Sequence, residues 1–160
     1  MLFMVAPIPD GYHNVTPTLT VKGASGAIEF YKKAFGAQEL YRFPGLDGIS
    51  IMHAEIKIGD SIIMLCDEMP QMGVLSPKST GGPSGSIFLY VKNSDEVFDK
   101  AISAGAKAKM PMMDAFWGDR AGTLEDPYGH IWTVSTRKKD MTPDGIKKAG
   151  EEFMKQMTQQ

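Results

Sequence analysis

Residues 116–137 read FWGDRAGTLEDPYGHIWTVSTR, and this stretch predicts the β-hairpin from which the fold can be worked out. Residues 126–129 (DPYG) have the composition of a tight turn, because proline presets φ at the second position and glycine accepts a strained last one. Residues 131–135 then alternate between two faces with the period of two that is typical of a strand. Residues 120–125 are expected to form the partner strand.

Three short motifs in this hairpin resemble a known family. Residues 116–120 (FWGDR), residues 126–130 (DPYGH) and Trp132 are similar to the signature of the PhnB-like branch of the glyoxalase/bleomycin-resistance/dioxygenase superfamily, the vicinal oxygen chelate fold. The resemblance covers roughly residues 12–140. It implies an α+β fold in which two β-α-β-β-β modules pair their sheets into a half-open barrel around a cleft. It does not fix an activity, because one fold supports many functions.

Composition predicts a soluble globular protein. The 160 residues are 42% hydrophobic and carry a formal net charge of −2 without a long basic block, so we expect no nucleic-acid partner. No stretch has the apolar length of a membrane span, and the first residues lack the basic region of a signal peptide, so we expect no membrane association. The single cysteine, Cys66, fits a reducing compartment, and we expect a cytoplasmic protein.

The first predicted module, residues 12–68, reads β-α-β-β-β. Apolar residues at helical spacing indicate its helix, and Gly36 is a natural stop for it. A two-residue turn, Gly59-Asp60, joins its last two strands. The expected elements are a strand at 15–21, a helix at 26–35, and strands at 38–43, 49–58 and 61–66.

The second predicted module, residues 86–137, repeats this order after a loop at 69–85 that is rich in glycine, proline and serine. Asn93 and Glu96 fit a capping box at the start of its helix. The expected elements are a strand at 87–91, a helix at 94–104, a strand at 107–112 and the hairpin.

Residues 141–160 are predicted to form a C-terminal helical tail. Thr142 is its expected N-cap and Pro143 its first helical residue. The tail carries an apolar stripe that packs either on the body of the protein or on a second subunit. The stripe consists of Ile146, Ala149, Phe153 and Met157.

Metal-dependent members of the resembled superfamily hold a divalent ion with histidines or carboxylates from equivalent strands. Alignment by strand and turn places Thr16, Met64, Ser86 and Thr133 at those positions. Hydroxyls and thioethers are weak ligands for a catalytic divalent ion, so we predict no metal at the superfamily position and no other cofactor.

Other polar residues are candidates for chemistry on the predicted strand 49–58. Counting across the Gly59-Asp60 turn places Glu55 opposite Met64, and His53 two residues away on the same face. His53 and Glu55 could act as acid and base or bind a displaced metal, or they could belong to a solvated strand face. The predicted cleft face carries Ile51, His53, Glu55 and Lys57, and the predicted helix-facing side carries Met52, Ala54, Ile56 and Ile58.

The hairpin and its partner strand supply candidate ligand-binding residues. Arg120 is predicted opposite Ser135 on the side of Thr133, where it could bind an anionic group or pair with a neighbouring acid (Asp119, Glu125 or Asp126). Phe116 and Trp117 follow a Met-rich loop at 110–113 and could line a pocket or pack in the core. Residues expected to share one further cleft face are Ser86, Phe88 and Tyr90, with Met64 and Thr133 nearby. Trp132 is predicted to be core, and His130 to bond the backbone of its turn.

Three functions remain open from the sequence. The first is a metal-free binder of a small, partly apolar molecule. The second is a metal-dependent lyase, isomerase or dioxygenase-type enzyme with a displaced site, and the third is a structural role. Related sequences are sometimes labelled as ubiquinone-pathway methyltransferases, but no glycine-rich nucleotide motif supports that activity here. The resemblance also leads us to expect a homodimer.

Overall fold

The structure is a computed structural model that describes residues 5–159, which fall into two compact units. The first unit comprises residues 5–83 together with the turn at 127–130, and the second comprises 84–126 with 131–159. Each unit contains one open four-stranded mixed sheet and at least one helix packed on it, so the predicted α+β class is confirmed.

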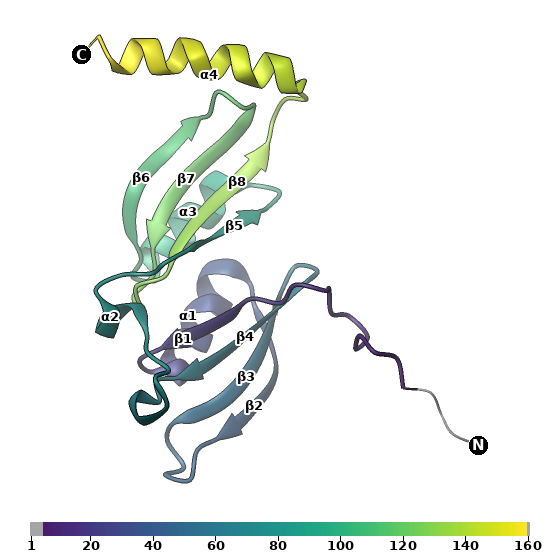
Figure 1. Cartoon of the computed structure of the whole chain (residues 1–160), viewed down its shortest axis with the longest axis vertical. Coiled ribbons are helices and arrows are strands. Elements are labelled where there is room, and N and C mark those ends of the chain that lie inside the picture. The colour runs from purple at the N-terminus through teal and green to yellow at the C-terminus, as the bar shows by residue number, and fades with distance from the viewer. Residues whose placement is uncertain (1–4, 160) are drawn as a thin grey trace. The chain divides into compact units, whose positions relative to one another are not determined.

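The first unit has the strand order β1-β4-β3-β2, with β1 parallel to β4 and the other pairs antiparallel. Helix α1 covers one face of this sheet (Figure 1). The elements are β1 (Thr18–Val21), α1 (Ala24–Phe35), β2 (Gln38–Pro44), β3 (Ile51–Ile58), β4 (Ser61–Asp67), the 3-10 turn η1 (Pro70–Met72) and the short α2 (Pro77–Thr80).

The core of the first unit lies between α1 and its sheet. Alternation along β3 and β4 sends Ile56 and Leu65 to the helix side, where both are fully buried with Tyr31 of α1. The start of α1 is capped from β4, because Asp67 Oδ1 accepts hydrogen bonds from the amides of Gly23 and Ala24 at 2.7 and 2.8 Å. A local sequence pattern could not reveal this cap.

The DPYG turn packs within the first unit. The Tyr128 hydroxyl would lie 2.6 Å from a Cβ at Gly26, so a larger residue at this helix position would displace the Tyr128 side chain. His130 Nε2 lies 2.9 Å from the carbonyl oxygen of Thr20, so one backbone partner of His130 is on β1. This contact with β1 agrees with the predicted structural role of His130.

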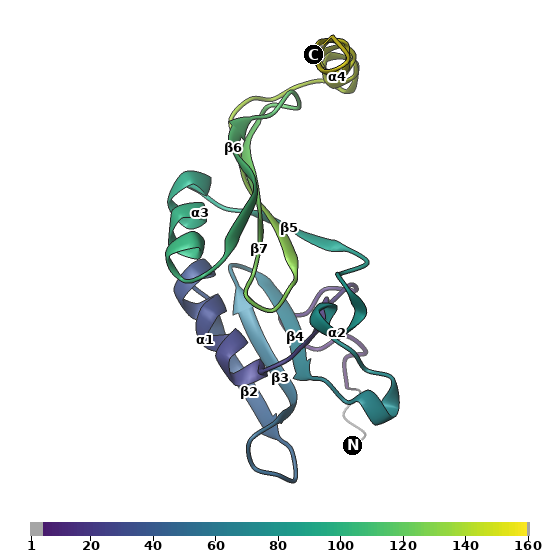
Figure 2. The same ribbon diagram turned by 90° about the vertical axis from the view of Figure 1, so that its left-hand side faces the viewer.

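The second unit repeats the architecture with the strand order β5-β8-β7-β6, in which β5 is parallel to β8. Helix α3 covers one face of its sheet (Figure 2). The elements are β5 (Ser86–Tyr90), α3 (Ser94–Ser103), β6 (Lys107–Asp114), β7 (Asp119–Glu125), β8 (Ile131–Arg137) and α4 (Pro143–Met157).

Trp132 is the largest fully buried side chain of the second unit, as predicted. Its indole Nε1 donates to Asp126 Oδ2 at 2.9 Å, and this carboxylate is itself buried. The capping box at α3 is confirmed, since the Glu96 amide donates to Asn93 Oδ1 at 3.3 Å. The strand expected at 107–112 is confirmed as part of β6, which therefore also includes the Met-rich residues 110–113 described above as a loop; the pairing of β6 with β7 is irregular there.

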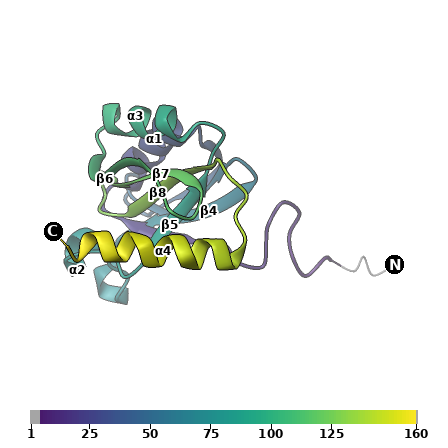
Figure 3. The same ribbon diagram turned by 90° about the horizontal axis from the view of Figure 1, so that it is seen from above.

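Helix α4 begins as predicted, with the Gly145 amide donating to Thr142 Oγ1 at 3.1 Å and Pro143 in the first turn. It lies past the turn between β6 and β7 (Figures 1 and 2) and is straight and unbroken (Figure 3). Its contacts with the rest of the second unit include an aromatic pair, since the rings of Phe153 and Phe116 lie 5.5 Å apart. No residue of α4 that the structure describes is buried.

Candidate functional site

The open face of the first sheet brings the predicted pair together. His53 Nε2 lies 3.1 Å from Glu55 Oε1, and the hydroxyl of Tyr12 also donates to Glu55. These two hydrogen bonds, Tyr12 first, lower the pKa of the Glu55 carboxyl below its usual value. Glu55 pairs with Met64 across β3 and β4, as predicted. The arrangement is an imidazole held beside a carboxylate, and the Tyr41 ring is tilted by 51° to the His53 ring with its centroid 6.1 Å away.

The predicted faces of β3 are wrong at its first two residues. Ile51 is 3% exposed and Met52 is 45% exposed, the reverse of the predicted burial. The pairing of β2 with β3 shifts between Phe43 and Pro44, so Met52 is an extra residue at a bulge. From His53 onward the predicted alternation holds.

The residues at the superfamily metal positions do not form a donor set that suits a divalent ion. Thr16 precedes β1, Met64 pairs with Thr18 on β1, and Thr133 Oγ1 lies 3.0 Å from Thr123 Oγ1. Among residues 5–159, no three or more histidine, cysteine, aspartate or glutamate side chains gather as a metal site would require. Hydroxyls and a thioether lack the basicity of the usual ligands.

The open face of the second sheet carries the predicted aromatic residues. Phe88 pairs with Thr133, and Ser86 pairs with Ile131, across β5 and β8. The rings of Phe88 and Tyr90 lie 5.1 Å apart, and both side chains are exposed. This places Ser86, Phe88 and Tyr90 on one face.

Arg120 is on the other face, so its predicted position is wrong. It pairs with Thr136 rather than Ser135, because the loop between β7 and β8 spans five residues. Its guanidinium is held by carboxylates: Nη2 lies 2.9 Å from Asp95 Oδ1, and Nη1 lies 3.6 Å from Asp114 Oδ1. Neither acid was among the predicted partners.

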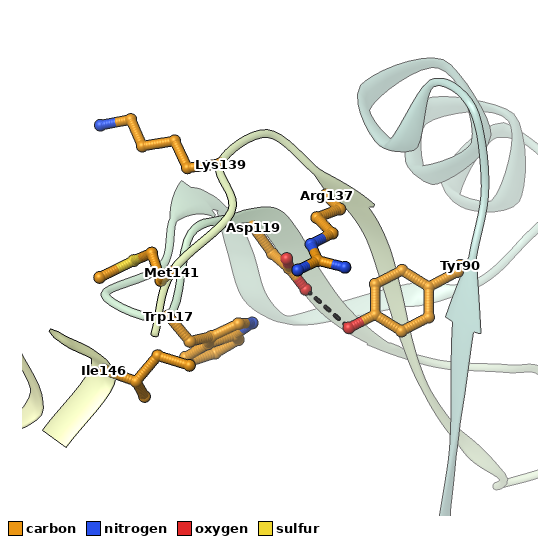
Figure 4. A pocket seen from close by; sticks show the side chains of 7 residues that line it. All are labelled: Tyr90, Trp117, Asp119, Arg137, Lys139, Met141 and Ile146. Atoms are coloured by element: carbon orange, nitrogen blue, oxygen red, sulfur yellow. Dashed lines mark hydrogen bonds between the residues drawn. The ribbon is translucent and has the colours of Figure 1, made fainter. Parts of the chain in front are cut away.

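A pocket of about 390 Å³ opens in the second unit, and we call it the Asp119 pocket (Figure 4). Two of its residues, Tyr90 and Trp117, were predicted from the sequence. Its volume lies within the range of ordinary small-molecule sites. The lining residues are Tyr90, Trp117, Asp119, Arg137, Lys139, Met141 and Ile146.

The Asp119 carboxylate is the organising group of this pocket. It is only 4% exposed, and its Oδ2 accepts hydrogen bonds from the Tyr90 hydroxyl at 3.0 Å and the Ser135 hydroxyl at 2.8 Å. Partial desolvation of the phenol, followed by its bond to Asp119, raises the pKa of Tyr90. The Tyr90 phenol therefore remains protonated at neutral pH and donates its hydrogen to Asp119.

Cations and apolar groups complete the Asp119 pocket. Arg137 extends over the Tyr90–Asp119 hydrogen bond (Figure 4), and its Nη2 lies 2.7 Å from Asp140. Lys139 makes no ion pair in the part of the chain that the structure describes. The apolar side comes from Trp117, Met141 and Ile146, and the Trp117 ring meets Phe116 edge-on at 5.1 Å.

Sequence reasoning missed most of the polar half of the pocket. Asp119 lies in the quoted FWGDR motif, and correct strand counting would have placed it opposite Arg137. Lys139 and Met141 follow β8 without a periodic pattern. Lys139 is positioned by Gly118, whose carbonyl oxygen accepts hydrogen bonds from the amides of Lys138 and Lys139 at 3.0 Å each.

The fold and these sheets define a protein of the Glyoxalase/Bleomycin resistance protein/Dioxygenase superfamily, whose profile matches residues 13–134, and the chain belongs to that superfamily. An uncharacterized protein of Mycobacterium bovis is 40% identical over 138 residues, spanning 84% of this chain and 90% of the relative. Protein YjdN of Escherichia coli is 27% identical, spanning 80% of this chain and 98% of the relative.

Solved structures share this fold. TioX from Micromonospora sp. ML1 aligns with a TM-score of 0.60 and 26% identity, covering 81% of this chain and all of that chain (100%). A PhnB protein from Bacillus cereus aligns with a TM-score of 0.61 and 19% identity, covering 78% and 99%, which shows the fold alone. No helix among residues 5–159 is both long enough and apolar enough to cross a membrane.

Proposed function

We propose that this protein binds a small molecule that combines a ring or other apolar body with an anionic group, and that the Asp119 pocket is the site. The observation that carries the proposal is the buried Asp119 carboxylate, fixed by Tyr90 and Ser135 inside a pocket of about 390 Å³. A few fixed polar groups among apolar walls are the usual composition of a small-molecule site.

The charges of the Asp119 pocket favour an anion. Lys139 supplies a positive charge that makes no ion pair in the described residues, and Arg137 supplies a second that it shares with Asp140, whereas the negative charge of Asp119 is already shared between two hydroxyl donors. A carboxylate or phosphate on the ligand would gain charge-assisted hydrogen bonds from these cations. Trp117 and Ile146 offer an apolar surface for the remainder of the ligand.

The test is a thermal-shift and tryptophan-fluorescence screen of aromatic carboxylates against their neutral amides. A ligand that binds only the folded state raises the melting temperature with concentration. Lys139→Ala should weaken carboxylate binding by about 10-fold, the loss of one charge-assisted contact. Lys138→Ala is the matched control, because Lys138 is adjacent and exposed but does not line the pocket. Equal effects of the two variants, or equal binding of acids and amides, would contradict the proposal.

We also propose that the chain belongs to the PhnB-like branch and works without a metal at the superfamily position. The FWGDR and DPYGH motifs support the branch, and the donor chemistry of Thr16, Met64, Ser86 and Thr133 supports the lack of metal. Elemental analysis of protein purified without chelator tests the second part, since a stoichiometric divalent ion would overturn it.

A second candidate is proton transfer by His53 on the open face of the first sheet. It is favoured by the contact of His53 with Glu55, which fixes one ring nitrogen and leaves Nδ1 for a substrate proton. The same pair would be the first suspect if a displaced metal were found. Loss of a measured activity in His53→Ala with an unchanged melting temperature would support this candidate.

A further inference from the structure

Helix α4 supplies one wall of the Asp119 pocket. Ile146, in the first turn of the helix, lines the pocket together with Met141 from the segment that precedes α4. Tyr90, Asp119 and Arg137 line it from three strands of the sheet. The pocket is therefore complete only when α4 lies against the rest of the second unit.

One face of α4 holds the helix in this position. Ile146, Gly150 and Phe153 share that face by their spacing along the helix, and all three are half-buried. The Phe153 ring lies 5.5 Å from the ring of Phe116, and a Cβ at Gly150 would lie 3.1 Å from the same ring. A helix held by half-buried contacts on one face separates from its support more easily than a core helix does.

The chain between β8 and α4 has a place where the helix can change its direction. The amides of residues 138–139 are fixed, because both donate to the Gly118 carbonyl oxygen at 3.0 Å. The next fixed point is Thr142, the N-cap of α4. Residues 140–141 lie between these points and can absorb a change of angle, as hinge residues at the ends of elements do.

We propose that α4 is a movable wall of the Asp119 pocket, and that Ile146 determines the size of the apolar group that the pocket accepts. In the view of Figure 4, Arg137 and Lys139 lie toward the upper edge of the pocket, and Ile146 lies at the lower edge beside Trp117. A ligand whose anionic group is bound by the two cations therefore extends its apolar body toward Ile146. The proposal deepens the proposed small-molecule function and rests on it.

A ligand that touches Ile146 should hold the whole helix in place. Its contact adds to those of Gly150 and Phe153, which do not line the pocket, so ligand binding and the docking of α4 favour each other. A detached helix of 15 residues frays in water, and its amides then exchange with solvent.

Hydrogen exchange measures this coupling in the full-length protein. Benzoate and naphthoate are the probes, because they carry the same carboxylate on one ring and on two. Saturating naphthoate should slow the exchange of the amides of residues 147–157, which do not line the pocket, by about 10-fold. The amides of α3 in the same unit are the internal control and should exchange at an unchanged rate.

Calorimetric titration of three variants with the two acids tests the role of each side chain. Ile146→Ala should shift the preference toward naphthoate by about 10-fold, because it removes the wall that limits the ligand. Phe153→Ala should weaken both acids by about 10-fold, since it lowers the docked fraction of α4 without touching the pocket. Met154→Ala is the matched control, because this neighbouring side chain is 59% exposed and does not line the pocket, and it should bind like wild type.

The outcomes separate this inference from the proposed function. Binding of the acids without slower exchange in α4, an unchanged preference in Ile146→Ala, or equal affinities of Phe153→Ala and Met154→Ala would each overturn the inference and leave the proposed function standing. Failure of the wild type to bind either acid at millimolar concentration would overturn the proposed function, and the inference with it. Circular dichroism shows that each variant is folded.

Discussion

The contact of Asp119 with Ser135 should be measurable as a coupling energy in unfolding experiments. Asp119→Ala leaves the fully buried Ser135 hydroxyl without its acceptor, and an unsatisfied buried hydroxyl costs about 1–3 kcal/mol. Ser135→Ala removes a hydrogen bond to a charged group, worth about 1.5–3 kcal/mol. The Tyr90 contact contributes less, because this side chain is 62% exposed and water can replace its partner.

We therefore expect each single variant to lose about 2 kcal/mol of unfolding free energy and the double variant to lose about 2–3 kcal/mol rather than about 4. The resulting coupling energy is about 1–2 kcal/mol. Urea unfolding followed by circular dichroism measures all four corners of the cycle. Tyr90→Phe is the control and should lose less than about 1 kcal/mol. Losses that add within about 0.3–0.5 kcal/mol would refute the reasoning, because independent sites behave in that way.

Further expectations concern the first sheet, the start of the tail and metal binding. Tyr12→Phe should raise the pKa of Glu55 toward its ordinary value, because the Tyr12 hydrogen bond is the largest cause of its depression and His53 the second; carboxyl chemical shifts across a pH titration measure this. A carboxyl whose pKa is lower in the folded state than in the unfolded state stabilises the fold at pH values above its unfolded-state pKa. This stabilisation is lost as the pH falls through the folded-state pKa. Tyr12→Phe should therefore also make stability fall less steeply as the solution is acidified. Gly118→Ala should lose about 2 kcal/mol or more of unfolding free energy, since φ is +99° and the new Cβ would lie 2.8 Å from the Lys139 carbonyl oxygen. Gly85→Ala is the control and should be neutral, because no atom lies within 4 Å of its Cβ position. Thermal unfolding compares the two variants. Divalent cations should leave the melting temperature unchanged, and a rise that saturates at one ion per chain would contradict this expectation.

The elements themselves could be predicted because their signals are local. Turn composition at 126–129, helical spacing before Gly36 and the cap at Thr142 each depend on neighbouring residues, and the structure confirms them. The repeated strand order followed from the same local signals. In the Asp119 pocket, Tyr90 and Trp117 were predicted, because aromatic residues on an alternating strand or beside a turn stand out in the sequence.

Strand register was less predictable than the strands. Arg120 was placed on the wrong face because the hairpin loop has five residues instead of two, and a shift of one residue moves a side chain to the other face. Ile51 and Met52 were exchanged for a similar reason, since a bulge adds one residue that no pattern in β3 reveals. Both errors arose at irregular backbone.

The sequence by itself determined the class of fold, the order of the elements, the buried Trp132 and the weakness of the donor set at the superfamily metal positions, because residue type and short-range periodicity decide these properties. Tertiary structure alone decided which polar groups meet in the Asp119 pocket. Asp119, Tyr90 and Ser135 lie on three different strands, and the two hydroxyls donate to the Asp119 carboxylate. Lys139 is held nearby because its amide donates to the Gly118 carbonyl oxygen. Side-chain hydrogen bonds between strands depend on strand register and on loop length, and no single segment of the sequence predicts either of them.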